Sequence, residues 1–161
     1  MRKNILSIFI FIITILSILS FIYVNYKSDV EAINDIDISI NNVDIFDLEI
    51  TSFKLNLDVE IINPSNREIN QLSSDFDIYI ENRYIGTGNF SNADIQKNSN
   101  ISKDVIITIY YSGLAEAVVN IIENLISDGE FDLRINGIIY AKALFGMSII
   151  EQTFIASKTY P

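Results

Sequence analysis

The chain has 161 residues, with 11 Lys and Arg, 21 Asp and Glu, a formal net charge of −10, and neither His nor Cys. The missing residues exclude a Ser-His-Asp triad, an imidazole base, a disulfide, a thiolate nucleophile and any metal site with His or Cys ligands. The acidic charge argues against a nucleic-acid binder, which needs a basic surface. A hydrophobic fraction of 49% is unusual beside this charge, and it indicates two segments suited to two different solvents.

Residues 5–24 form an apolar run with no charged side chain. Twenty helical residues span about 30 Å, the thickness of the hydrocarbon core of a bilayer. Arg2 and Lys3 precede the run, and Tyr23 and Tyr26 lie where an interfacial aromatic belt would be. The positive-inside rule therefore predicts a cytoplasmic N-terminus over residues 1–4 and an anchor over 5–24, with the rest of the chain outside the cytoplasm.

A cleaved signal peptide is the competing interpretation of this run. The apolar region of a signal peptide is usually about 7–15 residues long and ends in a small-x-small cleavage site. The run here is longer, and the residues after Ser20 offer no such site. We therefore expect an uncleaved single-pass anchor.

The part outside the membrane is strongly acidic. Nine of the eleven cationic residues and all 21 acidic residues lie from residue 25 onward, so this part carries a formal charge of −12. Residues 25–34 are polar and predict a short linker, and residues 35–161 form the predicted domain. Most acids fall on solvent-facing strand positions, where they keep the domain soluble, discourage edge-to-edge association and repel anionic headgroups.

Apolar residues alternate with polar ones along most of this domain. Such a period of two predicts strands with one face toward a core and one toward water. The predicted strands cover residues 36–40, 48–50, 53–61, 76–80, 105–111 and 131–135, with two more in 138–155, divided near Gly146.

Turn residues separate these strands. Asn63-Pro64-Ser65-Asn66 is expected to end the long strand, because Pro64 has no N–H to donate and restrains the residue before it. Asn82-Arg83 predicts a tight hairpin, and Gly86 and Gly88 predict a bulge or a close backbone approach.

One segment has the period of a helix. Between Leu114 and Ile126 the apolar residues recur at three- and four-residue spacing, with Ser112 as a candidate cap and Gly129 as a terminator. The fold predicted from these elements is mainly β: a two-sheet antiparallel sandwich of the immunoglobulin or fibronectin III-like kind with one amphipathic helix, preceded by the transmembrane helix.

The order of these segments resembles the group 2 late embryogenesis abundant (LEA type 2) proteins, whose core is the WHy (water stress and hypersensitive response) domain. The resemblance covers residues 36–157 and rests on the long strand into Asn63-Pro64-Ser65-Asn66, on 77–80 and 85–88, on the later helix and on 135–140. The third position of the short motif is Ser65 where the family usually has Asn. The resemblance implies a folded sandwich with a role in tolerance of drying or related stress, often behind a membrane anchor. It also implies lipid or other apolar ligands in some relatives, and no catalytic residues.

The candidate site residues each have a structural interpretation. Asn63-Pro64 is explained by strand termination. Asp128, Glu130 and Asp132 lack the central Gly and the other ligands of a calcium loop, so Glu130 and Asp132 are predicted to be the solvent face of a strand. The pairs Asp35/Asp37 and Asp75/Asp77 are interpreted in the same way, and a glycosidase-type carboxylate pair has no other support.

Asn89 and Asn100 each begin an Asn-x-Ser acceptor pattern on the side of the membrane that we predict to be outside. They are the candidate glycosylation sites. We predict no catalytic, cofactor-binding or metal-binding residue, and no cofactor.

The function predicted from the sequence is that of a non-enzymatic, membrane-anchored, extracytoplasmic WHy-type domain that protects membrane or envelope proteins under desiccation or osmotic stress. Two alternatives stay open: a module that binds lipid or another apolar ligand, and an envelope interaction or adhesion module. The expected partner is the membrane, through the N-terminal helix. A lipid or an envelope protein is the second candidate partner, and nucleic acid is not expected.

Overall fold

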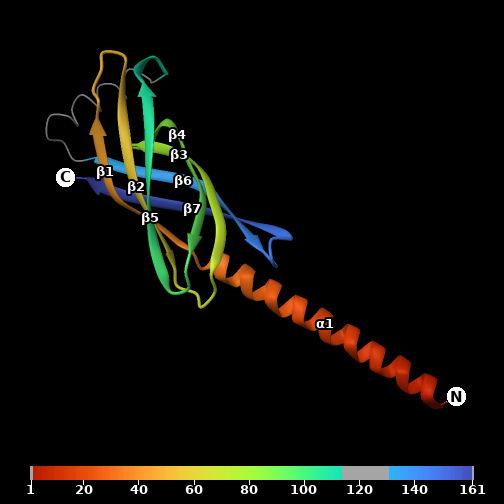
Figure 1. Ribbon diagram of the computed structural model, residues 1–161. Coiled ribbons are helices and arrows are strands. Elements are labelled where there is room, and N and C mark those ends of the chain that lie inside the picture. The colour runs from red at the N-terminus through yellow and green to blue at the C-terminus, as the bar shows by residue number, and fades with distance from the viewer. Residues whose placement is uncertain (1, 114–130, 161) are drawn as a thin grey trace.

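The computed structural model describes residues 2–113 and 131–160 (Figure 1). A long helix, α1 (Arg2–Asn34), leads into seven strands that form two sheets. The amphipathic helix predicted over residues 114–126 lies outside the described residues.

Helix α1 is continuous for 33 residues. The side chains of residues 6–24 are all exposed, and the hydroxyls of Thr14 and Ser17 each donate a 2.9 Å hydrogen bond to the carbonyl four residues earlier. These internal bonds satisfy the polar groups of an apolar helix. By length and composition, Leu6–Asn34 is able to cross a membrane, a property that it shares with signal sequences.

Residues 25–34, predicted as a linker, form the last turns of α1 instead. Ala32 and Ile33 are buried against the sandwich, and the carbonyl of Asn34 accepts a 2.9 Å hydrogen bond from Gln152 Nε2. Most residues of this segment are polar, but Ala32 and Ile33 form a short buried stripe. The helix therefore enters the folded domain without an intervening irregular segment.

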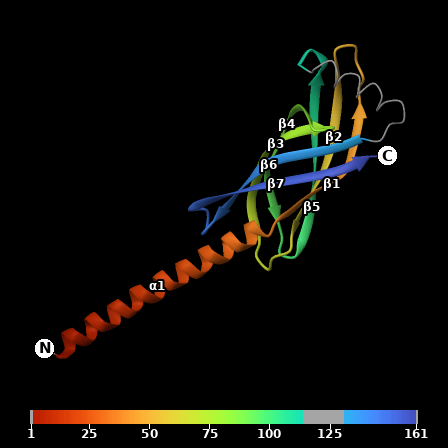
Figure 2. The same cartoon turned by 180° about the vertical axis from the view of Figure 1, so that it is seen from behind.

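The strands form two antiparallel sheets that face each other (Figures 1 and 2). The first sheet has the order β1 (Asp37–Phe46), β2 (Ser52–Asn63) and β5 (Ser99–Tyr110), which is followed by the 3₁₀ turn η1 (Tyr111–Gly113). The second has the order β4 (Arg83–Ile95), β3 (Ile69–Ile80), β6 (Phe131–Ala143) and β7 (Ser148–Tyr160). The predicted two-sheet antiparallel sandwich is confirmed.

Alternation along the strands builds the core between the sheets. In β2 the residues at every second position are fully buried, and those between them are only partly exposed. The buried series of β2 consists of Phe53, Leu55, Leu57, Val59 and Ile61. The residues alternate in the sequence because one face of this strand is covered by the second sheet, and that alternation is what predicts the strand.

Two glycines leave room for the side chain of Phe76 in the second sheet. Phe76 of β3 pairs with Gly88 of β4 on one side and with Gly137 of β6 on the other. A Cβ atom on Gly88 would lie 2.5 Å from the Phe76 ring, and Phe154 packs edge-on against the same ring with centroids 6.4 Å apart. The close approach predicted at Gly88 is confirmed, and a register shift next to Gly86 confirms the predicted bulge.

Three local predictions need correction. Ile80 pairs with Arg83, so the tight turn is Glu81–Asn82, both with positive φ, and not Asn82-Arg83. Residues 48–50 lie in the β1–β2 connection instead of a strand, and Ile50 is 99% exposed, because two alternating residues are too few to pair. Residues 131–135 and 138–143 belong to one strand, β6, although the turn near Gly146 is as predicted.

The β1–β2 connection lies at the end of the sandwich away from α1 (Figure 1). There the Nζ of Lys54 donates a 2.7 Å hydrogen bond to Oδ2 of Asp47, and this bond raises the pKa of Lys54 above its ordinary value of 10.5. Both side chains are exposed, so the ion pair acts locally.

Candidate functional site

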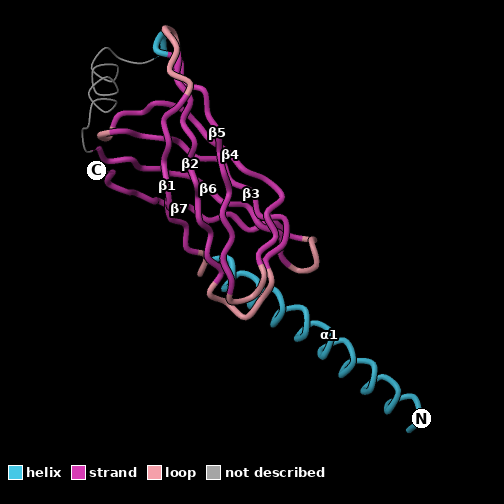
Figure 3. Tube along the Cα trace, turned by 60° about the vertical axis from the view of Figure 1, so that its left-hand side comes forward, coloured by secondary structure: helices cyan, strands magenta, loops and turns pink. Residues whose placement is uncertain are grey.

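The connection between β2 and β3 lies at the end of the sandwich that α1 enters (Figures 1 and 3). Asn63, the last residue of β2, is fully buried and uses its whole amide. Its Nδ2 donates to the carbonyls of Arg67 and Gln96, at 2.7 and 3.1 Å, and its Oδ1 accepts from the N–H and the hydroxyl of Ser65, at 3.1 and 2.7 Å. Asn63 therefore ends the strand, as predicted, and also joins the β2–β3 connection to the β4–β5 connection.

This connection directs Arg67 toward α1. The Nε of Arg67 lies 3.0 Å from Oδ1 of Asp29, and its Nη2 forms an ion pair with the same oxygen. Oδ1 of Asn25, one helical turn earlier, lies 3.4 Å from Nη1 of Arg67. The side chain of Asp29 is 17% exposed and that of Arg67 35%, so the pair is partly shielded from water and stronger than a surface pair.

The second carboxylate oxygen of Asp29 contacts a third element. Oδ2 of Asp29 accepts a 2.8 Å hydrogen bond from the backbone N–H of Leu144, in the turn between β6 and β7. Leu144 and Phe145 both have positive φ, which turns that N–H toward the helix. One carboxylate thus joins α1, the β2–β3 connection and the β6–β7 turn, and we call this arrangement of Asp29, Arg67 and Leu144 the anchor joint.

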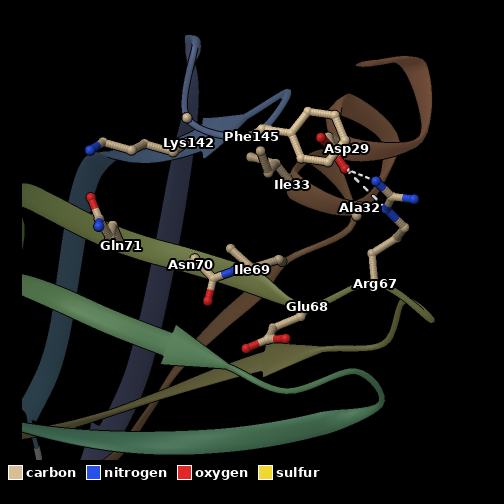
Figure 4. A pocket seen from close by; sticks show the side chains of 11 residues that line it. Asp29, Ala32, Ile33, Arg67, Glu68, Ile69, Asn70, Gln71, Lys142 and Phe145 are labelled. Carbon is tan, nitrogen blue, oxygen red and sulfur yellow. Dashed lines mark hydrogen bonds and ion pairs between the residues drawn. The ribbon is translucent and has the colours of Figure 1, made fainter. Parts of the chain in front are cut away.

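A cavity of about 450 Å³ lies beside the anchor joint (Figure 4). Its walls carry two acids, Asp29 and Glu68, two cations, Arg67 and Lys142, and the amide side chains of Asn70 and Gln71. Figure 4 shows the guanidinium of Arg67 turned toward Asp29, which fixes both charges in place. The lining residues come from α1, from the β2–β3 connection with the start of β3, and from the end of β6 with the β6–β7 turn.

The candidate glycosylation sites named from the sequence lie apart from the anchor joint. Asn89 and Asn100 are both exposed, on the edge strands β4 and β5 of different sheets, and the amide of Asn100 donates to Glu60. Glycosylation at these positions stays a prediction. The Asn63-Pro64 motif is the one candidate that contributes to the joint.

The paired acidic residues face solvent, fully or in part. Asp35, Asp37 and Asp75 are exposed and Asp77 is partly exposed. Asp132 is exposed too, and its Oδ1 accepts a hydrogen bond from Thr159. Asp128 and Glu130 lie outside the described residues. Within residues 2–113 and 131–160, no three Asp or Glu residues converge as metal ligands would.

The residues of the joint could not be named from the sequence. Asp29 is 38 positions from Arg67 and 115 positions from Leu144, and no local pattern pairs residues that far apart. One signal was present: Val30 and Ile33 have helical spacing and begin six residues after Val24, the end of the apolar run. It indicates that the helix continues, although it does not identify the partners of Asp29.

No protein-family model matches the chain, and no curated protein matches it either. The fold of the chain does match solved structures. The solution structure of At1g01470 from Arabidopsis thaliana is similar with a TM-score of 0.58 and 17% identity, over 76% of this chain and 79% of that one. At2g46140.1, described as a "putative late embryogenesis abundant (LEA) protein", has a TM-score of 0.47 and 13% identity, over 92% of this chain and 84% of that one.

A protein from Archaeoglobus fulgidus has a TM-score of 0.47 and 12% identity, over 75% of this chain and 95% of that one. At identities this low a structural likeness concerns the fold alone. The likeness to the Arabidopsis protein At1g01470 thus identifies the two-sheet sandwich of this chain as a fold that occurs in other proteins.

Proposed function

We propose that the chain is a non-enzymatic, single-pass membrane protein whose WHy-type sandwich lies outside the cytoplasm and protects membrane or envelope proteins when water is withdrawn. The observation that carries the anchoring part is the course of α1. Its apolar residues project away from the sandwich with exposed side chains, and the same helix continues without a break into the core at Ala32 and Ile33.

An exposed apolar helix of this length is more stable in an apolar environment, such as the interior of a bilayer, than in water. Leaving many large apolar side chains in water costs about 1.5–3 kcal/mol for each one that could be buried, so the helix favours insertion in a bilayer. Arg2 and Lys3 before the run favour a cytoplasmic N-terminus. The anchor joint then holds the acidic domain next to the membrane.

The stress role has its support in the resemblance to LEA type 2 proteins. The sandwich shared with At1g01470 agrees with that resemblance, because the resemblance implies such a fold. The excess of acids on the domain supplies a strongly hydrated surface, which suits a protein that must stay soluble as water is lost. The protection would act on the membrane to which α1 holds the domain and on the proteins beside it.

Two experiments test the two parts separately. Alkaline extraction of membranes, followed by intact-protein mass measurement, is expected to leave the full chain in the pellet; a shortened chain in the supernatant would contradict anchoring. Deletion of the gene is expected to lower survival and envelope integrity after controlled drying, with rescue by the full chain. Survival that is unchanged by deletion would disprove the stress role and leave the anchor standing.

A further inference from the structure

The turn between β6 and β7, residues 144–147, carries large apolar side chains in an exposed position. Phe145 is 77% exposed and Met147 is 73% exposed, and Ile149 follows them on β7, also exposed. Figure 4 shows the Phe145 ring at the edge of the cavity, on the side of α1. Side chains of this kind in an exposed turn cost free energy in water unless another surface covers them.

The anchor joint fixes the height of this turn relative to the apolar part of α1. The N–H of Leu144 is bonded to Asp29, which is five residues beyond Val24, the last residue of the apolar run. At 1.5 Å per residue the turn lies about 7–8 Å beyond the end of the run along the helix axis. The headgroup region on each side of a bilayer is about 5–8 Å thick, so a spanning α1 places the turn within it or at its outer edge.

The chemistry of the turn suits a headgroup layer. The N–H groups of Gly146 and Met147 donate to the carbonyls of Ala143 and Leu144, both at 3.1 Å, so insertion would leave these two donors satisfied. Lys142 is exposed directly before the turn and offers a cation to lipid phosphates. Tyr23 and Tyr26, also exposed, provide interfacial aromatic residues on α1 between the end of the apolar run and the level of Asp29, about 9 and 4–5 Å from that level along the helix axis.

We propose that the tip of the β6–β7 hairpin inserts Phe145 and Met147 into the headgroup region of the same bilayer that holds α1. The inference rests on the proposed anchoring. It gives the domain two membrane contacts, the helix and the hairpin tip. Because two contacts restrict rotation about either one, they would fix which face of the sandwich is turned toward the membrane.

The test uses full-length chain in vesicles of phosphatidylcholine with a minor share of phosphatidylglycerol. Because the chain has no Cys, Met147→Cys supplies a single thiol for an environment-sensitive fluorophore. The matched control is Ile50→Cys, another exposed apolar residue, at the opposite end of the sandwich. We expect blue-shifted emission and quenching by headgroup-labelled lipid at position 147, with neither effect at position 50.

Flotation of the same vesicles separates the two proposals. Protein that floats with the vesicles but shows no quenching at position 147 would overturn the hairpin insertion and leave the anchor intact. Protein that fails to float would overturn both. In the labelled protein, Phe145→Asp is expected to abolish the quenching without preventing flotation, and circular dichroism would confirm that this exposed substitution leaves the sandwich folded.

Discussion

Asp29 and Arg67 join helix α1 to the sandwich: Nε of Arg67 lies 3.0 Å from Oδ1 of Asp29, and Oδ2 of Asp29 accepts a 2.8 Å hydrogen bond from the N–H of Leu144. Both carboxylate oxygens are therefore engaged, each by a different part of the domain. Water would replace these charged hydrogen bonds poorly if either partner moved away. Asp29 is therefore the residue that couples the helix to the domain.

Asp29→Asn is expected to lower the free energy of unfolding of the sandwich by about 1–2 kcal/mol, because the ion pair is lost and the bond to Leu144 loses its charged acceptor. Urea unfolding of the full chain in detergent micelles, followed by tyrosine fluorescence, would measure it. Glu31→Gln is the matched control, since Glu31 pairs with Lys27 at 3.5 Å, both side chains are exposed, and its loss should change stability by less than about 0.5 kcal/mol.

The coupling itself is accessible by a double-mutant cycle. Asp29→Asn and Arg67→Gln, singly and together, are expected to give an interaction energy of about 1 kcal/mol. Additive effects of the two substitutions would show that the pair contributes nothing beyond its separate contacts.

Asn63→Ala is expected to destabilise the domain by about 2–3 kcal/mol, since it removes a fully buried amide that donates to the carbonyls of Arg67 and Gln96 and accepts from Ser65. Asn66→Ala, at an exposed position of the same connection, should stay within about 0.5 kcal/mol. Equal effects of the two substitutions in the same unfolding assay would contradict the role given to the buried amide.

Two glycines of the second sheet, Gly137 and Gly86, predict an order of effects. At Gly137 an added methyl group meets the Asp75 carbonyl at 2.6 Å and the Phe76 Cβ at 2.5 Å, neither of which can rotate away. At Gly86 it meets, among the described residues, just the end of the Ile109 side chain, at 3.0 Å. Gly137→Ala should therefore cost about 2–3 kcal/mol and Gly86→Ala less than about 1 kcal/mol, as thermal unfolding would show. The reverse order would contradict this packing.

Much of the fold was predictable because strands carry a local signal. The series from Phe53 to Ile61 alternates without a fault, and its period alone indicates a strand with one buried face. The segment 48–50 has the same alternation but is too short to pair, so its prediction was wrong. The predicted turn, at residues 82–83, is one residue away from the observed turn at residues 81–82, because turn preferences do not fix register.

The candidate site could not be predicted to the same extent. The role of Asn63 as a strand end was visible from the Pro that follows it. The partners of Asp29 were not, since they are brought together only when both sheets and the helix have assembled. The continuation of α1 through residues 25–34 was missed because polar residues outnumber the few buried ones there.

A distance measurement between α1 and the sandwich tests the joint most directly. Tyr23→Cys and Ile106→Cys, both at exposed positions, carry spin labels on the helix and on β5 in full chain reconstituted into phosphatidylcholine nanodiscs. A continuous helix held by Asp29 and Arg67 predicts a single narrow distance distribution, which Arg67→Ala broadens. A broad distribution in the unsubstituted joint, unchanged by Arg67→Ala, would contradict a fixed connection between α1 and the domain.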